Sequence, residues 1–141
     1  YPAVDYLDVN MSYLIAATGF FTTQFTAEMA ANQMLNFASS AISFCKELKT
    51  SKKDEIMVQA GMITGGPVIA GVITLNKVPH FEIIGEIVEY AKSMANLAPP
   101  FSIHLTRSTY ELVYGSGFDV REVGGIKVPL LGSIVTYTIS I

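Results

Sequence analysis

Residues 58–73, VQAGMITGGPVIAGVI, decide the fold of this chain. They overlap two runs of apolar, β-branched-rich sequence, 56–63 and 68–75, which flank the tetrapeptide Thr-Gly-Gly-Pro at 64–67. β-branched residues favour strands, and Gly and Pro supply the backbone conformations of tight turns. The pattern therefore predicts two strands joined as a hairpin.

Two shorter runs precede this stretch. Residues 4–9 alternate apolar and polar side chains, which is the period of a half-buried strand. A second run covers residues 12–17, and Asn10 with Met11 suits a tight turn between the two. A strand pair is therefore predicted at the start of the chain.

A long amphipathic helix is predicted between these regions, because apolar residues recur at spacings of three and four. Thr26 can cap its first turn, Glu28 lies near its positive end, and Lys46 and Lys49 lie near its negative end. Cys45 falls on the apolar side and is expected to be an inert core thiol. The predicted apolar stripe consists of Phe25, Met29, Met34, Phe37, Ala41, Phe44 and Leu48.

The remaining elements are short, and the polar segment 49–55 predicts a loop. We expect strands at 81–84, 101–105, 118–123, 126–128 and 134–139, and helices at 86–96 and 106–114. Pro99 and Pro100 end the first of these helices. Helices mixed with hairpins predict an α+β fold on one core. Because the chain has no repeat, low-complexity tract or linker, residues 1–141 are expected to form a single domain.

Composition narrows the classes of function. Half of the 141 residues are hydrophobic and 15% are charged, against roughly 25% in an ordinary soluble domain. The net charge of −3 leaves no cationic surface for nucleic acid. The single cysteine excludes a disulfide framework and suits a reducing compartment.

The apolar runs are too short to cross a membrane, so no direct membrane contact is expected from this segment. The apolar surplus predicts an oligomer face, with a plain apolar-rich domain as the alternative.

Isolated motifs predict little chemistry. The glycines of residues 66–71 resemble a phosphate loop, but residues 72–73 are Val-Ile where Lys and Ser or Thr would be required. His80 and His104 lack a Cys or Asp at ligand spacing. Three carboxylates could hold Mg²⁺ or Ca²⁺, although a solvated acidic face is the preferred interpretation. They belong to Glu82, Glu86 and Glu89.

Several motifs in register resemble one known family. Residues 58–73 closely resemble the central hairpin of class III nucleotidyl cyclases, where Gly-Ile-His-x-Gly-Pro-Val-x-Ala-Gly-Val is typical. Residues 81–91, FEIIGEIVEYA, resemble the family's Tyr-x-x-Trp/Phe-Gly-x-x-Val-Asn-x-Ala, and residues 103–110 resemble its Ile-x-Val-Ser-x-x-Thr. The pair at 136–137 resembles the closing Thr-Tyr, and residues 4–19 resemble the hairpin that carries Thr-Ile-Gly-Asp in active members. The resemblance covers nearly the whole chain.

The resemblance implies a ferredoxin-like α+β domain that dimerises head to tail. In active members two Mg²⁺ or Mn²⁺ ions, held by two aspartates, activate the ribose 3′-hydroxyl, which displaces pyrophosphate from the α-phosphorus. The first metal aspartate belongs to a strand and helix that precede the hairpin of residues 4–19. This chain starts after them, so an N-terminally incomplete domain from a longer chain is expected.

The family's other catalytic positions fall on residues of different chemistry. By resemblance, the second metal aspartate corresponds to Ser12, the ribose-orienting asparagine to Glu89 and the transition-state arginine to Ser93. The loop that supplies a phosphate-binding lysine corresponds to residues 129–132, where Leu131 leaves no cation. The loss of even one preorganised donor commonly lowers turnover by a factor of about 10²–10³. No catalytic residue and no metal site are therefore predicted.

The base-reading positions of the family correspond to Asp8 and Glu82. Together with Glu89 they place acids where an active member binds a nucleoside triphosphate. No cofactor is predicted, and Mg²⁺ or Mn²⁺ would enter only if the chain were active. The residues expected at the family's turns are kept, namely Gly61, Gly66, Pro67, Gly71, Gly85 and Gly132.

These observations predict a catalytically inactive cyclase homology domain. It would act as a dimerisation or regulatory module in cyclic-nucleotide signalling, as a homodimer or paired with another cyclase domain. Two alternatives remain open. One is a divergent active cyclase that uses Glu82, Glu86 or Glu89 as metal ligands to convert ATP or GTP to cyclic nucleotide and pyrophosphate. The other is a ligand-sensing domain whose vestigial cleft binds a cationic or neutral molecule. The expected location is the cytoplasm, either free or as the cytosolic part of a membrane protein.

Overall fold

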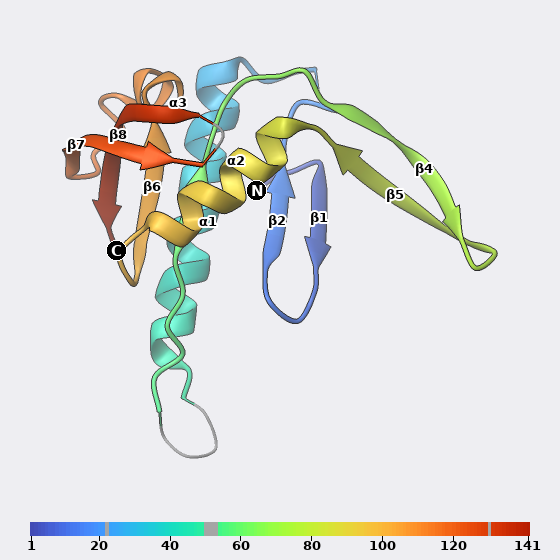
Figure 1. Cartoon of the computed structure of the whole chain (residues 1–141), viewed down its shortest axis with the longest axis horizontal. Helices are drawn as coiled ribbons and strands as arrows, with labels where there is room; N and C mark the ends of the chain where they lie inside the picture. Colours follow the sequence, from blue (N-terminus) through green and yellow to red (C-terminus); the bar gives the residue numbers. More distant parts are fainter. Residues whose placement is uncertain (22, 50–53, 130) are drawn as a thin grey trace.

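The computed structural model describes residues 1–21, 23–49, 54–129 and 131–141. Figure 1 shows the arrangement of its helices and strands. In chain order these are β1 (Tyr6–Val9), β2 (Leu14–Ala17), α1 (Ala27–Glu47), β3 (Ala60–Met62), β4 (Ile69–Leu75), β5 (Val78–Ile84), α2 (Glu86–Leu97), β6 (Ser102–Thr106), α3 (Arg107–Val113), β7 (Val120–Val128) and β8 (Gly132–Ser140).

A four-stranded sheet with the order β3-β6-β8-β7 forms the centre of the fold. β3 runs parallel to β6, whereas β6 with β8 and β8 with β7 are antiparallel pairs. The β1–β2 and β4–β5 hairpins form separate two-stranded sheets. The β4–β5 hairpin extends far to one side of the molecule (Figure 1). The fold is therefore mixed α and β with mostly antiparallel pairing, as predicted.

The core lies between the central sheet and the helices α1 and α3. Side chains alternate between the two faces of a strand, so Ile103 and Leu105 of β6 point to one face and His104 points to the other. Ile103 and Leu105 are fully buried in one cluster with Leu35 of α1 and Val113 of α3. Burial of such side chains contributes roughly 1.5–3 kcal/mol each. The face of β6 that carries His104 is left for α2.

Helix α2 packs closely on this second face because Gly61 of β3 has no side chain. A Cβ atom at Gly61 would lie 2.3 Å from both the carbonyl oxygen of Ala91 and the backbone nitrogen of Ala95. The expectation that Gly61 and Gly71 occupy turns is wrong, because they lie within β3 and β4. At Gly61 the requirement is the close approach of a helix backbone.

The hairpin predicted from residues 56–63 and 68–75 does not form. Its first run contains β3, which pairs with β6 through contacts such as Met62 with Leu105. Its second run contains β4, which turns back to β5 through Asn76 and Lys77 with φ of 48° and 66°. Two left-handed residues suit a tight hairpin loop. The prediction is wrong because local turn chemistry does not determine which distant strand becomes the partner.

The long helix is confirmed, but its buried face is not the predicted stripe. The hydroxyl of Thr26 accepts a hydrogen bond of 3.2 Å from the backbone nitrogen of Met29, so the predicted cap is present. Met29 and Phe44 are 50% and 63% exposed, and the C-terminal part of α1 extends beyond the central sheet (Figure 1). The buried residues of α1 are Ala31, Leu35 and Ile42.

Other expectations near the end of α1 and in β7 also need correction. Cys45 is a half-buried free thiol outside the core cluster. Residues 50–53 of the predicted loop 49–55 lie outside the described residues, and Lys49 and Glu55 pair in an isolated bridge. β7 is one strand with an irregular register between Val123 and Ile126, instead of two strands. The other predicted helices and strands are confirmed, with bounds shifted by a few residues.

Candidate active site

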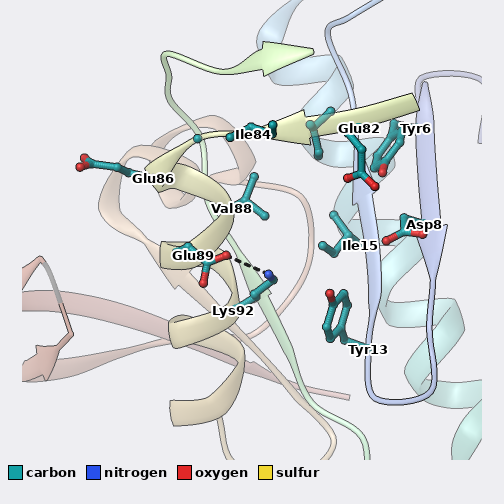
Figure 2. A pocket seen from close by; sticks show the side chains of 12 residues that line it. Tyr6, Asp8, Tyr13, Ile15, Glu82, Ile84, Glu86, Val88, Glu89 and Lys92 are labelled. Atoms are coloured by element: carbon teal, nitrogen blue, oxygen red, sulfur yellow. Dashed lines mark hydrogen bonds and ion pairs between the residues drawn. The ribbon is translucent and has the colours of Figure 1, made fainter. Parts of the chain in front are cut away.

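A cleft of about 530 Å³ lies between the β1–β2 hairpin, the end of β5 and the first turns of α2 (Figure 2). These elements are far apart in the sequence, and the fold brings their polar side chains to one place. The ionisable lining residues are Tyr6 and Asp8 of β1, Tyr13 beside β2, Glu82 of β5, and Glu86, Glu89 and Lys92 of α2. The cleft is therefore rich in carboxylates.

Two local hydrogen-bond networks fix the β1–β2 hairpin that forms one wall. At its base, Oδ2 of Asp5 accepts hydrogen bonds from the backbone nitrogens of Gly19 and Phe20, at 2.8 and 2.9 Å. At its tip, Oδ1 of Asn10 accepts one of 2.8 Å from the backbone nitrogen of Ser12. Asp and Asn side chains commonly stabilise turns in this way. The wall is thus held at both ends.

Aromatic contacts join this wall to β5. The rings of Tyr6 and Phe21 lie 5.5 and 5.3 Å from the ring of Phe81, and the Tyr6 hydroxyl donates a 3.4 Å hydrogen bond to the Phe81 carbonyl. This contact holds Glu82, the next residue of β5, near Asp8. Burial raises the pKa of Tyr6, and the negative charges of Asp8 and Glu82 raise it further. The two carboxylates therefore act on the same phenol.

On the opposite side, Lys92 is held within the cleft by two contacts. Its Nζ atom lies 2.8 Å from Oε1 of Glu89 and 5.0 Å from the centre of the Tyr13 ring. The hydrogen bond to Glu89 raises the pKa of Lys92, against the opposing effect of burial. Lys92 is the only cation among the described residues of the lining. Asp8 and Glu82 form no salt bridge with any described residue.

The structure gathers some of the site residues suggested by the resemblance and leaves others outside. Asp8, Glu82 and Glu89 line the cleft together (Figure 2). Ser12 is exposed in the loop between β1 and β2, and the half-buried Ser93 lies on α2 outside the lining. The half-buried Leu131, between β7 and β8, also lies outside the lining. The acidic half of the predicted site therefore lines one cleft, with Asp8 and Glu82 on one side and Glu89 on the other, and the other three positions lie outside the lining.

Sequence reasoning missed Lys92 and the two tyrosines of the cleft. The spacing from Glu89 to Lys92 was an available signal, because residues three apart on a helix are neighbours. No local signal predicts that Tyr13 would face Lys92, since this contact joins the first hairpin to α2. Glu86 is directed away from the other carboxylates (Figure 2). It accepts a 2.9 Å hydrogen bond from the Tyr90 hydroxyl.

The described residues do not supply a carboxylate at the second metal position that the resemblance implies. They contain no group of three or more His, Cys, Asp or Glu side chains that could hold a metal ion. Ser12, at a position where the resemblance requires a carboxylate, offers a neutral hydroxyl and lies outside the lining. His80 is exposed, and His104 is buried beside Thr136 at 2.8 Å. No catalytic step through a metal follows from this donor set.

The fold and the family profile define a nucleotidyl cyclase-type domain. The sequence profile of the adenylate and guanylate cyclase catalytic domain matches residues 12–141, and the chain belongs to this family. The rat guanylate cyclase soluble subunit beta-2 is 31% identical over 111 residues, which are 78% of this chain and 16% of that relative. The chain thus spans about one sixth of the length of this curated relative.

Solved structures confirm the class III cyclase fold. The guanylate cyclase domain of RhGC from Catenaria anguillulae, in complex with GTP, superimposes with a TM-score of 0.72 and 28% identity over 84% of this chain and 63% of that one. A non-canonical dimeric guanylyl cyclase domain from Blastocladiella emersonii gives 0.67 and 29% over 84% and 62%. Within the described residues, each helix is too short or too polar to span a bilayer.

Proposed function

We propose that this chain is a catalytically inactive cyclase homology domain, which serves as a dimerisation or regulatory module in cyclic-nucleotide signalling in the cytoplasm. The observation that carries the proposal is the charge of the cleft. Asp8 and Glu82 are half-buried carboxylates without a salt bridge to the described residues, and the cation Lys92 is paired with Glu89. A nucleoside triphosphate entering this cleft would meet net negative charge.

The electrostatic consequence is unfavourable for substrate and transition state alike. A nucleoside triphosphate carries about four negative charges, and each carboxylate about 10 Å away raises its free energy by roughly 0.4–1.7 kcal/mol per unit charge, depending on solvation. Phosphoryl chemistry requires the opposite, preorganised cations where charge develops. The resemblance offers Ser93 and Leu131 where active members carry such cations. Among the described residues of the cleft, the cation available to offset the repulsion is Lys92, and it is already paired with Glu89.

The alternative of a divergent active cyclase has less support. It uses Glu82, Glu86 or Glu89 as metal ligands, but Glu86 is directed away and bonded to Tyr90, and Glu89 is paired with Lys92, so that Glu82 is the one of the three without a salt bridge or side-chain hydrogen bond among the described residues. The ligand-sensing alternative stays a prediction. The Lys92 ammonium, seated between Glu89 and the Tyr13 ring, shows the type of group that such a cleft can hold.

The pairing role is supported by the exposed apolar surface of the β4–β5 hairpin. Ile69, Val72 and Leu75 of β4 are 74%, 66% and 55% exposed, and Val78 and Ile84 of β5 are 52% and 59% exposed. Exposed apolar patches commonly mark interaction sites. The relative from Blastocladiella emersonii is described as dimeric. We therefore propose that the partner is a second cyclase domain, of the same or another chain.

A turnover assay tests the proposed inactivity. The domain at micromolar concentration is incubated with Mn²⁺ and either ATP or GTP, and the cyclic product is quantified. We expect no product above the protein-free blank with either nucleotide. Product that rises faster than linearly with protein concentration would show dimeric catalysis and contradict the proposal. In that case Glu89→Ala would show whether the cleft carboxylates serve the reaction.

A further inference from the structure

A second cavity, which we call the aromatic pocket, has a volume of about 240 Å³ and shares no residue with the cleft. It lies at the C-terminal end of α3, where the chain leaves the helix and turns into β7. Three of its lining residues are aromatic and one is an acid, in the set Tyr110, Tyr114, Gly115, Phe118, Asp119 and Val120. Aromatic rings beside a carboxylate favour an organic cation.

Two rings of the aromatic pocket stand nearly perpendicular to each other. The ring centres of Tyr110 and Tyr114 lie 5.8 Å apart, with 83° between the ring planes. The Tyr110 ring is also stacked on the ring of the buried Tyr137, with 4.1 Å between the centres and 9° between the planes. One wall is therefore fixed on the core, whereas the Tyr114 side chain is 73% exposed and open to a ligand.

The turn after α3 brings the third ring and the acid to the same place. Gly115 and Gly117 have φ of 82° and 89°, a left-handed conformation that glycine adopts without steric cost. Beyond this turn, Phe118 and Asp119 line the pocket together with Tyr110. Phe118 and Tyr110 both pack against the core cluster. The pocket therefore has two walls that are anchored in the protein interior.

The carboxylate of Asp119 is available to a bound cation. Its Oδ2 atom lies 3.3 and 3.4 Å from Nη2 and Nε of Arg121, and both side chains are exposed. Exposed ion pairs of this kind contribute little free energy. The cation–π contacts found among the described residues are those of Lys46 with Phe101 and Lys92 with Tyr13, so they leave the rings of the aromatic pocket unoccupied. The carbonyl end of a helix also favours positive charge.

We propose that the aromatic pocket binds the trimethylammonium group of a small organic cation. A quaternary nitrogen carries a charge but no N–H group, so it gives up no hydrogen bond on entering the pocket. A primary ammonium has three N–H donors, and the charged acceptor of the lining is one carboxylate shared with Arg121. The size is also suitable, because a cavity of roughly 150 Å³ holds benzene and a trimethylammonium group is no larger.

An NMR titration of the isotope-labelled domain tests the proposal, with choline chloride as the probe and sodium chloride added to keep the ionic strength constant. We expect saturable shifts of the amide signals of Gly115 and Gly117, with a dissociation constant of about 1–10 mM, because cation–π contacts at partly exposed sites are weak. The matched ligand control is the neutral isostere of choline, in which a carbon atom replaces the charged nitrogen. It should bind about 10-fold more weakly.

Substitutions of exposed tyrosines show whether the ring itself binds the cation. Tyr114→Leu should weaken choline binding about 3- to 5-fold, and Tyr114→Phe, which keeps a ring, should bind within about 2-fold of the wild type. The matched control is Tyr1→Leu, because Tyr1 is also exposed and its ring stands edge-on to Phe37, with 5.5 Å between the centres and 78° between the planes. Tyr1 lies outside the pocket lining, so the affinity should not change.

Four results would overturn the proposal. They are the absence of saturable shifts up to about 50 mM choline, equal affinity for the neutral isostere, an unchanged affinity in Tyr114→Leu, and binding to phosphatidylcholine vesicles without binding to choline, which would indicate a membrane surface instead. Unchanged amide signals of the core would show that Tyr114→Leu is folded. None of these results bears on catalytic inactivity, which the turnover assay decides separately.

Discussion

His104 is a buried titratable residue outside the cleft. Its side chain is 1% exposed and its Nε2 atom lies 2.8 Å from Oγ1 of Thr136. Burial lowers the pKa of His104 from 6.5, and a backbone interaction with Met94 of α2 opposes this effect only in part. The folded domain therefore holds the neutral imidazole between the central sheet and α2, and protonation would place a charge in that interface.

The stability of the domain should consequently fall in mild acid. An unfolded chain takes up a proton near pH 6.5 that folded His104 resists. The free energy of unfolding should therefore decrease as pH falls below 6.5 and until the lower folded-state pKa is passed, by at most about 1.4 kcal/mol per pH unit. Urea unfolding at pH 7.5 and 5.5 would measure this for the wild type and for His104→Gln.

The glutamine variant supplies the comparison, because its amide can still bond to Thr136 but does not titrate. We expect a smaller pH dependence in His104→Gln than in the wild type. His80, the other histidine, is present in both proteins and cancels in the difference. Identical pH dependence of the two proteins would contradict the assignment of this effect to His104.

At the scale of elements, the packing of α2 on β3 depends on the absence of a side chain at Gly61. The backbone of α2 approaches Gly61 so closely that a Cβ atom would lie 2.3 Å from atoms of Ala91 and Ala95. Both atoms belong to the backbone of a helix and cannot rotate away. The same helix carries Glu89 and Lys92 into the cleft, so its position also determines the geometry of the site.

Gly61→Ala should therefore destabilise the domain strongly. The added Cβ atom would overlap with the backbone of α2 and push the helix away from β3. This should lower the free energy of unfolding by about 1–3 kcal/mol, the usual range for overpacking. Chemical denaturation measures the loss. Gly124→Ala in β7 is the matched control, because nothing lies within 4 Å of the position of its added Cβ, and a change within about 0.5 kcal/mol is expected. Equal stabilities of the two variants would disprove the close-packing account.

At the scale of the whole molecule, the sequence predicts elements better than their partners. The helix cap at Thr26 and the strand β4 depend on residues that are close in the sequence, and both are present. The pairing of β3 with β6 and the contact of Lys92 with Tyr13 join distant segments, and neither was predicted. The sequence pattern alone indicated an acidic face at Glu82, Glu86 and Glu89, and the family resemblance added Asp8 by assigning Asp8 and Glu82 to the two base-reading positions. The single-domain organisation of residues 1–141 stays a prediction.

The charge of the whole cleft, rather than any one side chain, should govern its response to nucleotides. Asp8→Asn combined with Glu82→Gln removes two carboxylates, each of which repels about four charges of the nucleotide by roughly 0.4 kcal/mol per charge pair in the solvated limit, so we expect a fluorescent ATP analogue to bind on the order of 100-fold more tightly at low salt. Fluorescence anisotropy would measure the affinity, and added salt should reduce the difference between variant and wild type.

The matched control is the double variant Glu111→Gln with Asp119→Asn, which removes two exposed acids outside the cleft lining. Equal affinities of the two double variants would mean that net charge, and not the cleft, repels the nucleotide. A selective gain in nucleotide affinity in the cleft variant, still without cyclic product, would support the proposed inactivity and would separate the repulsion that weakens binding from the chemical step.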